Sequence, residues 1–143
     1  MSRSVLSQAV LDEQFADLGL PPYDGDDLPA ASLLAARTAY GMGVEPRRPV
    51  LKAAVKYLLD ALVAVAPGKS VEVRVPPYAA VQCVEGPRHT RGTPPNVVEM
   101  DAATWIALAT GRLLWADAIA DGRIRASGSR ADLRPYLPVT PGG

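Results

Sequence analysis

Hydrophobic residues recur every three or four positions in three stretches of the first half of the chain, which predicts amphipathic helices. These stretches are residues 4–18, 29–40 and 49–65. The third stretch ends at Pro67 and Gly68, a pair that stops helices. Turn-rich segments, LGLPPYDGDDLP and EPRRP, separate the three. We therefore expect residues 1–45 to form an N-terminal helical extension and linker, and residues 46–143 to form the main domain.

After the third helix the pattern changes from helical spacing to strict alternation. Val71, Val73 and Val75 alternate with Glu72 and Arg74, as expected for a strand with one buried face. Three further strands are expected at residues 79–84, 96–99 and 123–126.

Between the last two expected strands, the segment DAATWIALATGRLLWADAIADGRIRASG predicts two short apolar helices. The carboxylate of Asp101 is suited to cap the first helix, and Gly111 is suited to end it. Apolar spacing resumes over residues 113–120 and stops at Gly122. A final turn or short helix is expected over residues 129–137. This order of helix, glycine, helix, glycine and strand predicts the path of the chain and says little about a chemical function.

Composition limits the classes of partner. The 143 residues suffice for one domain, and 15 basic residues balance 15 acidic ones, so binding to nucleic acid through phosphate attraction is not expected. The balance hides an asymmetry. Residues 1–45 hold two Arg against seven Asp and Glu, net −5, and residues 46–95 hold eight Lys and Arg against three acids, net +5. The acidic front either lies against the basic middle or is simply solvated.

Cysteine and histidine are too scarce for the common metal sites. Cys83 and His89 are each the only residue of their type, so no intramolecular disulfide and no metal site or cofactor is expected. The N-terminal residues lack the apolar core and cleavage site of a secretory signal. The longest mostly apolar stretch, residues 102–120, contains Arg112 and Asp117, which argues against a membrane span. We therefore expect a soluble, cytoplasmic protein.

A loop at residues 85–96, EGPRHTRGTPPN, gathers cationic groups between glycines and prolines. Arg88, His89 and Arg91 are suited to contact the carboxylate or phosphate head group of a ligand. The alternative is a solvated turn in which the arginines pair with nearby acidic residues.

The segment VEMDAATWIALATGRLLWADAIADGRIRASG resembles the sterol carrier protein two family, in which a strand leads into helix, Gly-Lys/Arg-Leu, helix, Gly-Lys/Arg-Ile/Leu and a strand ending on Gly. The resemblance covers roughly residues 49–137 and is strongest to the short actinobacterial branch of the family, judging by the block VEVRVPPYAAVQCVEGPRHTRGTPPNVVE. The matching positions are Thr104, Leu108, Gly111, Arg112, Leu113, Ala118, Ile119, Gly122, Arg123, Ile124 and Gly128.

The resemblance implies an α+β fold, with a curved, mainly antiparallel sheet covered by helices on one face and an apolar tunnel between them. Such tunnels hold fatty acids, sterols or other lipids. Pro135 and Pro138 disfavour a long C-terminal helix, so a smaller cavity is expected. The chain ends without a peroxisomal address, which suits a bacterial cytoplasm. The candidate ligand-binding residues are Val73, Val81, Trp105, Leu108, Leu113, Trp115, Ile119 and Ile124.

Apolar periodicity equally marks an ordinary core, so the function has an alternative. The favoured interpretation is an intracellular lipid-binding or lipid-transfer module with no catalytic residue. The alternative is a non-catalytic protein-interaction or structural module with a filled core, whose partner is a second copy or another protein. The third hypothesis is an enzyme of unknown reaction that uses His89. A catalytic pair of Cys83 and His89 has only weak spacing support.

Overall fold

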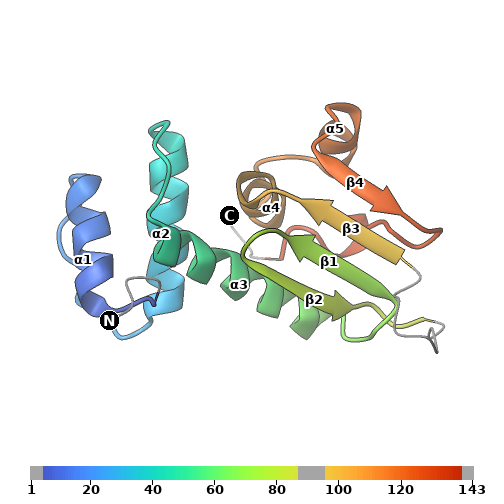
Figure 1. Ribbon diagram of the computed structural model, residues 1–143, viewed down its shortest axis with the longest axis horizontal. Coiled ribbons are helices and arrows are strands. Elements are labelled where there is room, and N and C mark those ends of the chain that lie inside the picture. Colours follow the sequence, from blue (N-terminus) through green and yellow to red (C-terminus); the bar gives the residue numbers. More distant parts are fainter. Residues whose placement is uncertain (1–4, 87–95, 140–143) are drawn as a thin grey trace. The chain divides into compact units, whose positions relative to one another are not determined.

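The computed structural model describes residues 5–86 and 96–139 (Figure 1). The chain divides into two compact units, Met1–Tyr57 and Leu58–Gly143. The division falls inside the long helix α3 (Arg48–Val65), which the hydrophobic spacing over residues 49–65 had predicted. Among the described helices, none combines the length and the apolar character needed to cross a membrane.

The first unit is built on two helices, α1 (Gln8–Asp17) and α2 (Leu28–Gly41), followed by the first half of α3. Helices α1 and α2 each begin after a residue whose side-chain oxygen accepts a backbone N–H of the first turn, which is Ser7 for α1 and Asp27 for α2. Alanines on α2 face larger side chains. The buried cluster consists of Leu11, Phe15, Leu18, Ala31, Ala35, Ala39 and Val50.

Arg47 ties the segment before α3 to helix α1. Its backbone N–H donates to Oε1 of the buried Gln14 at 2.6 Å, and its guanidinium pairs with Asp17 at 2.6 Å and with Glu13 at 3.0 Å. The hydrogen bond from Arg47 lowers the pKa of Asp17. Such exposed ion pairs contribute about 0–1 kcal/mol. The acidic N-terminal segment therefore contacts the first basic residue that follows it, and the partly buried hydrogen bond to Gln14 helps to fix the geometry of that contact.

The second unit contains a four-stranded sheet in the order β2-β1-β3-β4. Strands β1 and β2 are antiparallel, as are β3 and β4, whereas β1 and β3 are parallel. Two of the three pairings are thus antiparallel, which confirms the expected α+β class with a mainly antiparallel sheet. The strands are β1 (Val71–Val75), β2 (Ala79–Cys83), β3 (Asn96–Met100) and β4 (Ile124–Ser127).

One face of this sheet is buried and the other is polar. Val73 of β1 lies opposite Val81 of β2 and Val98 of β3, so alternate residues of the strands share one face. The second half of α3 runs behind the sheet in Figure 1. The buried side chains of this unit include Leu58, Leu62, Val71, Val73, Val75, Cys83, Val98, Trp105 and Leu108.

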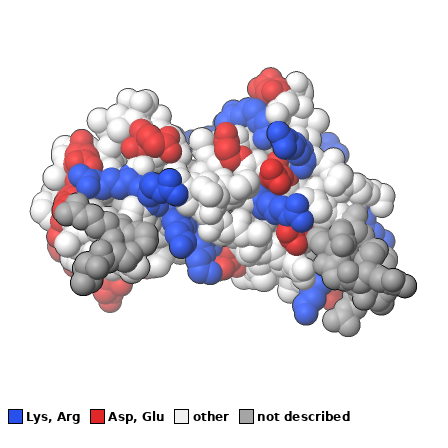
Figure 2. Space-filling model, in the orientation of Figure 1, with Lys and Arg blue, Asp and Glu red and all other residues white. Residues whose placement is uncertain are grey.

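The opposite face of the sheet carries charges of both signs. Arg74 pairs with Glu72 along β1, and Arg125 of β4 lies 4.0 Å from Glu99 of β3. Figure 2 shows acidic and basic side chains interleaved on this side of the molecule. Neither sign dominates, so this face offers no basic surface of the kind that nucleic-acid binding requires.

Asn96, the first residue of β3, joins three segments. Its Nδ2 donates to the carbonyl oxygen of Ser70 at 2.8 Å, and its Oδ1 accepts from the backbone N–H of Arg130 at 2.8 Å. Asn96 is only 3% exposed, and its hydrogen bond to Ser70 is buried, whereas the one from Arg130 is partly buried. The side chain therefore fixes the start of β1 and the segment after β4 to the same point.

Candidate functional site

The site is built on the helix pair that the sequence predicted. Helix α4 (Ala102–Ala109) begins at Asp101, whose Oδ1 accepts the backbone N–H of Thr104 at 2.8 Å. It ends near Gly111, which adopts a φ of +80° that favours glycine. Helix α5 (Trp115–Ala120) follows and ends before Gly122, which adopts a φ of +72°.

The C-terminal segment folds back onto the end of α4. Its described part, which ends at Val139, contains a single 3-10 turn, η1 (Arg134–Tyr136), in agreement with the expectation that the prolines disfavour a long helix. The backbone N–H of Val139 donates to the carbonyl oxygen of Ala109 at 2.9 Å, and thereby satisfies one of the carbonyl groups that the helix end leaves open. This contact brings the C-terminal residues beside the turn between α4 and α5.

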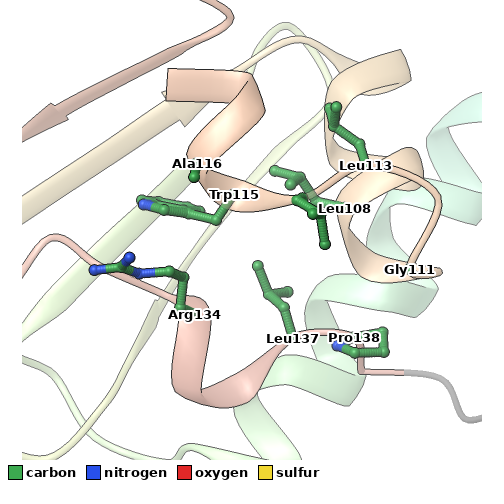
Figure 3. Close-up of a pocket in the computed structure, with 9 residues that line it drawn as sticks. Leu108, Gly111, Leu113, Trp115, Ala116, Arg134, Leu137 and Pro138 are labelled. Carbon is green, nitrogen blue, oxygen red and sulfur yellow. The ribbon is translucent and has the colours of Figure 1, made fainter. Parts of the chain in front are cut away.

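A pocket of about 380 Å³ lies between α4, α5 and this C-terminal segment (Figure 3). Eight of its nine lining residues are apolar, and Arg134 is the one that carries a charge. Both Leu108 and Trp115 are largely buried, at 1% and 8% exposed. The lining consists of Leu108, Gly111, Leu113, Leu114, Trp115, Ala116, Arg134, Leu137 and Pro138.

Three of the eight residues expected to bind a ligand, Leu108, Leu113 and Trp115, come together in this pocket. The other five lie elsewhere. Val73, Trp105 and Ile124 are buried, Val81 is half-buried on the edge strand β2, and Ile119 is 42% exposed on α5. No strand residue lines this pocket, whereas Val73 and Trp105 are fully buried. The ligand-binding role of all eight residues stays a prediction.

The lining has six further residues. Gly111, Leu114 and Ala116 belong to the helix pair and the turn within it, and Arg134, Leu137 and Pro138 belong to the C-terminal segment, which the sequence did not indicate as part of a site. The hydrogen bond between Val139 and Ala109 joins this segment to α4, which is far away in the sequence. The prolines predicted that no long helix forms at the C-terminus, but the local sequence does not indicate where this segment packs.

The proposed head-group residues Arg88, His89 and Arg91 lie outside the described residues. Their contact with a ligand therefore stays a prediction, as does the alternative of a solvated turn. The described residues contain no group of three His, Cys, Asp or Glu suited to hold a metal ion.

Cys83 is buried at the end of β2, and desolvation raises its pKa to about 11. A thiol needs its ionised form to act as a nucleophile. At neutral pH the side chain is therefore a small hydrophobic group of the core.

We expect Cys83 in the folded protein to react with Ellman's reagent at pH 8 at least roughly 100-fold more slowly than free cysteine, because the raised pKa leaves so little thiolate. The same protein in concentrated guanidinium chloride serves as the control and should react at the rate of a free thiol. Rapid modification of the folded protein would contradict the burial of this side chain.

Two positions of the helix-glycine motif contact each other directly. Nε of Arg123 donates to Oγ1 of Thr104 at 3.1 Å, and so joins the residue after Gly122 to helix α4.

A protein-family model described as "bacterial SCP ortholog" matches residues 47–139, which include α3, the whole sheet and every residue that lines the pocket. No curated protein matches the chain.

Proposed function

Since the chain belongs to the bacterial SCP ortholog family, a sterol carrier protein-like family, we propose that it is a lipid-binding module whose ligand occupies the pocket between α4, α5 and the C-terminal segment. The observation that carries this proposal is the composition of the lining, eight apolar residues and one arginine. Burial of apolar ligand surface contributes about 25 cal/mol of favourable free energy per Å², so such walls favour a hydrocarbon chain.

The size of the pocket favours a single-chain lipid. Its volume of about 380 Å³ is near the lower end of the range of about 300–1,000 Å³ that is typical of small-molecule sites. Leu114 lines the pocket and is 68% exposed, so the apolar wall reaches the protein surface. A ligand can therefore enter and leave without unfolding of the domain, as a carrier or transfer module requires. We propose no catalytic step, and the protonated Cys83 supports that view.

The proposal predicts that the purified protein releases a single-chain lipid on denaturation, detectable by mass spectrometry. It further predicts binding of a simple alkyl probe, decanoate or 1-decanol, by the delipidated protein. Binding can be followed by NMR through the indole N–H signals, because Trp115 lines the pocket and the other tryptophan, Trp105, does not. We expect the Trp115 signal to shift and the Trp105 signal to stay nearly unchanged.

A bulky side chain in the pocket should prevent this binding. Ala116 lines the pocket and is exposed, so Ala116→Trp should fold normally and occupy part of the cavity. Loss of contact for even two methylene groups weakens affinity by about 1.6 kcal/mol, roughly tenfold.

The matched control is Ala120→Trp, an exposed alanine on the same helix that does not line the pocket. This variant should bind like the unmodified protein, and thermal unfolding should show that both variants fold. Equal binding by all three proteins, or no binding of any alkyl probe to the unmodified protein, would overturn the proposed site.

A further inference from the structure

Arg134, the charged residue of the pocket, is held in position by a neighbour two residues away. Its Nε lies 3.1 and 3.0 Å from the two carboxylate oxygens of Asp132, and its Nη2 lies 2.6 Å from Oδ2. These hydrogen bonds lower the pKa of Asp132 and raise that of Arg134. Both groups are therefore ionised at neutral pH, and the guanidinium has a defined orientation.

Asp132 occupies only one edge of the guanidinium. Arginine has five N–H donors in a rigid plane, and Asp132 engages the edge formed by Nε and Nη2. Among residues 5–86 and 96–139, the hydrogen bonds of the Arg134 guanidinium all go to Asp132, and none of them uses Nη1. Within this part of the chain the edge formed by Nη1 and the remaining N–H of Nη2 is thus open, and its geometry matches the two oxygens of a carboxylate.

The direction of the side chains separates a charged side of the pocket from an apolar side. In Figure 3 the guanidinium of Arg134 and the indole ring of Trp115 extend toward the same side, and Leu108 and Leu137 lie toward the other. A ligand with its chain against the leucines therefore has its head group nearest to Arg134. This arrangement differs from that expected from the sequence, in which the loop at residues 85–96 supplies the cations.

We infer that Arg134 selects amphiphiles with a carboxylate head group, binding the carboxylate through its open edge while the alkyl chain occupies the apolar part of the pocket. Asp132 is a positioning residue, because it orients the guanidinium without contact with the ligand. This inference rests on the proposed function, since it assigns the head group of a ligand in the same pocket.

The contribution of Arg134 is limited by solvent. Its side chain is 63% exposed, so water and salt screen the interaction. We expect the unmodified protein to bind decanoate roughly five- to tenfold more tightly than 1-decanol, the range appropriate to a partly solvated charge-assisted hydrogen bond.

The test compares decanoate and 1-decanol at pH 7.5, below the concentrations at which they aggregate, with the indole signal of Trp115 as the readout. Arg134→Gln should bind the two probes almost equally, because it keeps a polar side chain and loses the charge. Arg134→Lys keeps the charge without the planar edge and should show an intermediate preference. The matched control, Arg112→Gln, removes the same charge from an exposed residue that does not line the pocket, and it should retain the full preference.

The outcomes separate this inference from the proposed function. If Arg134→Gln retains the full preference for decanoate, or if the unmodified protein has none, the role of Arg134 is wrong while the alkyl site stands. If decyl phosphate binds more tightly than decanoate, the assignment of the head group as a carboxylate is wrong. If the unmodified protein binds none of the probes, the proposed function itself fails, and this inference fails with it.

Discussion

Replacing Gly68 with alanine is expected to destabilise the second unit strongly, by roughly 2–5 kcal/mol, the combined cost of an unfavourable backbone conformation and of steric overlap. Gly68 lies in the turn between α3 and β1, at a φ of +147°, which residues with a Cβ rarely adopt. A Cβ at this position would overlap the carbonyl carbon and oxygen of Val84. Since domains are typically stable by only about 5–15 kcal/mol, the variant should show a large shift of the urea midpoint.

Val84 has little freedom to move away from such a Cβ. Its backbone N–H donates to the carbonyl oxygen of Ala66 at 2.6 Å, and its carbonyl oxygen accepts from N and Oγ of Ser70 at 3.0 and 2.7 Å. These bonds hold Val84 itself at a φ of +67°, an unusual conformation for a β-branched residue. Relief of the overlap would therefore break hydrogen bonds that connect the end of β2 to the start of β1.

The matched control is Gly122→Ala in the same unit. Gly122 has a φ of +72°, and an added Cβ meets no atom within 4 Å. The free energy of unfolding of this variant should therefore fall by only about 1–2 kcal/mol, from the backbone conformation alone. Urea unfolding followed by circular dichroism compares the two variants. Equal losses of stability would show that the close approach to Val84 does not constrain Gly68.

Asn96→Asp is expected to lower the free energy of unfolding by about 2–4 kcal/mol at pH 7, because it replaces a buried donor with a second acceptor. The Nδ2 that donates to the carbonyl oxygen of Ser70 becomes an oxygen, and the two oxygens repel each other. The Oδ1 that accepts from Arg130 is retained, so the shape of the side chain hardly changes. The loss thus reports on one hydrogen bond and one buried charge.

The effect of Asn96→Asp should depend on pH in a defined direction. Burial and the adjacent carbonyl disfavour ionisation, so the introduced carboxyl has a higher pKa in the folded state than its unfolded value of about 3.9. Its protonated form can donate to Ser70, so the destabilisation is small below about pH 4 and grows as the pH rises through the folded pKa. Gln82→Glu, an exposed position on β2, is the matched control and should show little such dependence. A constant difference between pH 4 and pH 7 would contradict the buried geometry of Asn96.

Local sequence patterns predicted the secondary structure well because the signals were strong and short-range. The alternation of valine with charged residues at 71–75 produced a strand with one buried face, and Asp101, Gly111 and Gly122 mark the limits of the helix pair. Each of these features depends on backbone preference or on a hydrogen bond within a few residues. Such preferences act in the same way wherever the segment packs.

The candidate site was predicted only in part, for a physical reason. Leu108, Leu113 and Trp115 were expected to form a wall, and they line the pocket because the helix pair brings them together locally. Val73 and Trp105 were expected in the same wall but have no exposed surface. Apolar periodicity identifies buried faces and cannot distinguish a packed face from one that borders an empty volume.

By itself the sequence determined the elements, the buried faces of the strands and the family resemblance, since these follow from the spacing of apolar residues and glycines. The tertiary structure alone decided where the C-terminal segment packs, that Asn96 joins Ser70 and Arg130, and that Arg134 borders the pocket. These contacts join residues distant in sequence, and each depends on the hydrogen-bond partner or the volume that another segment leaves open. No local preference encodes such a partner, so only the folded chain reveals it.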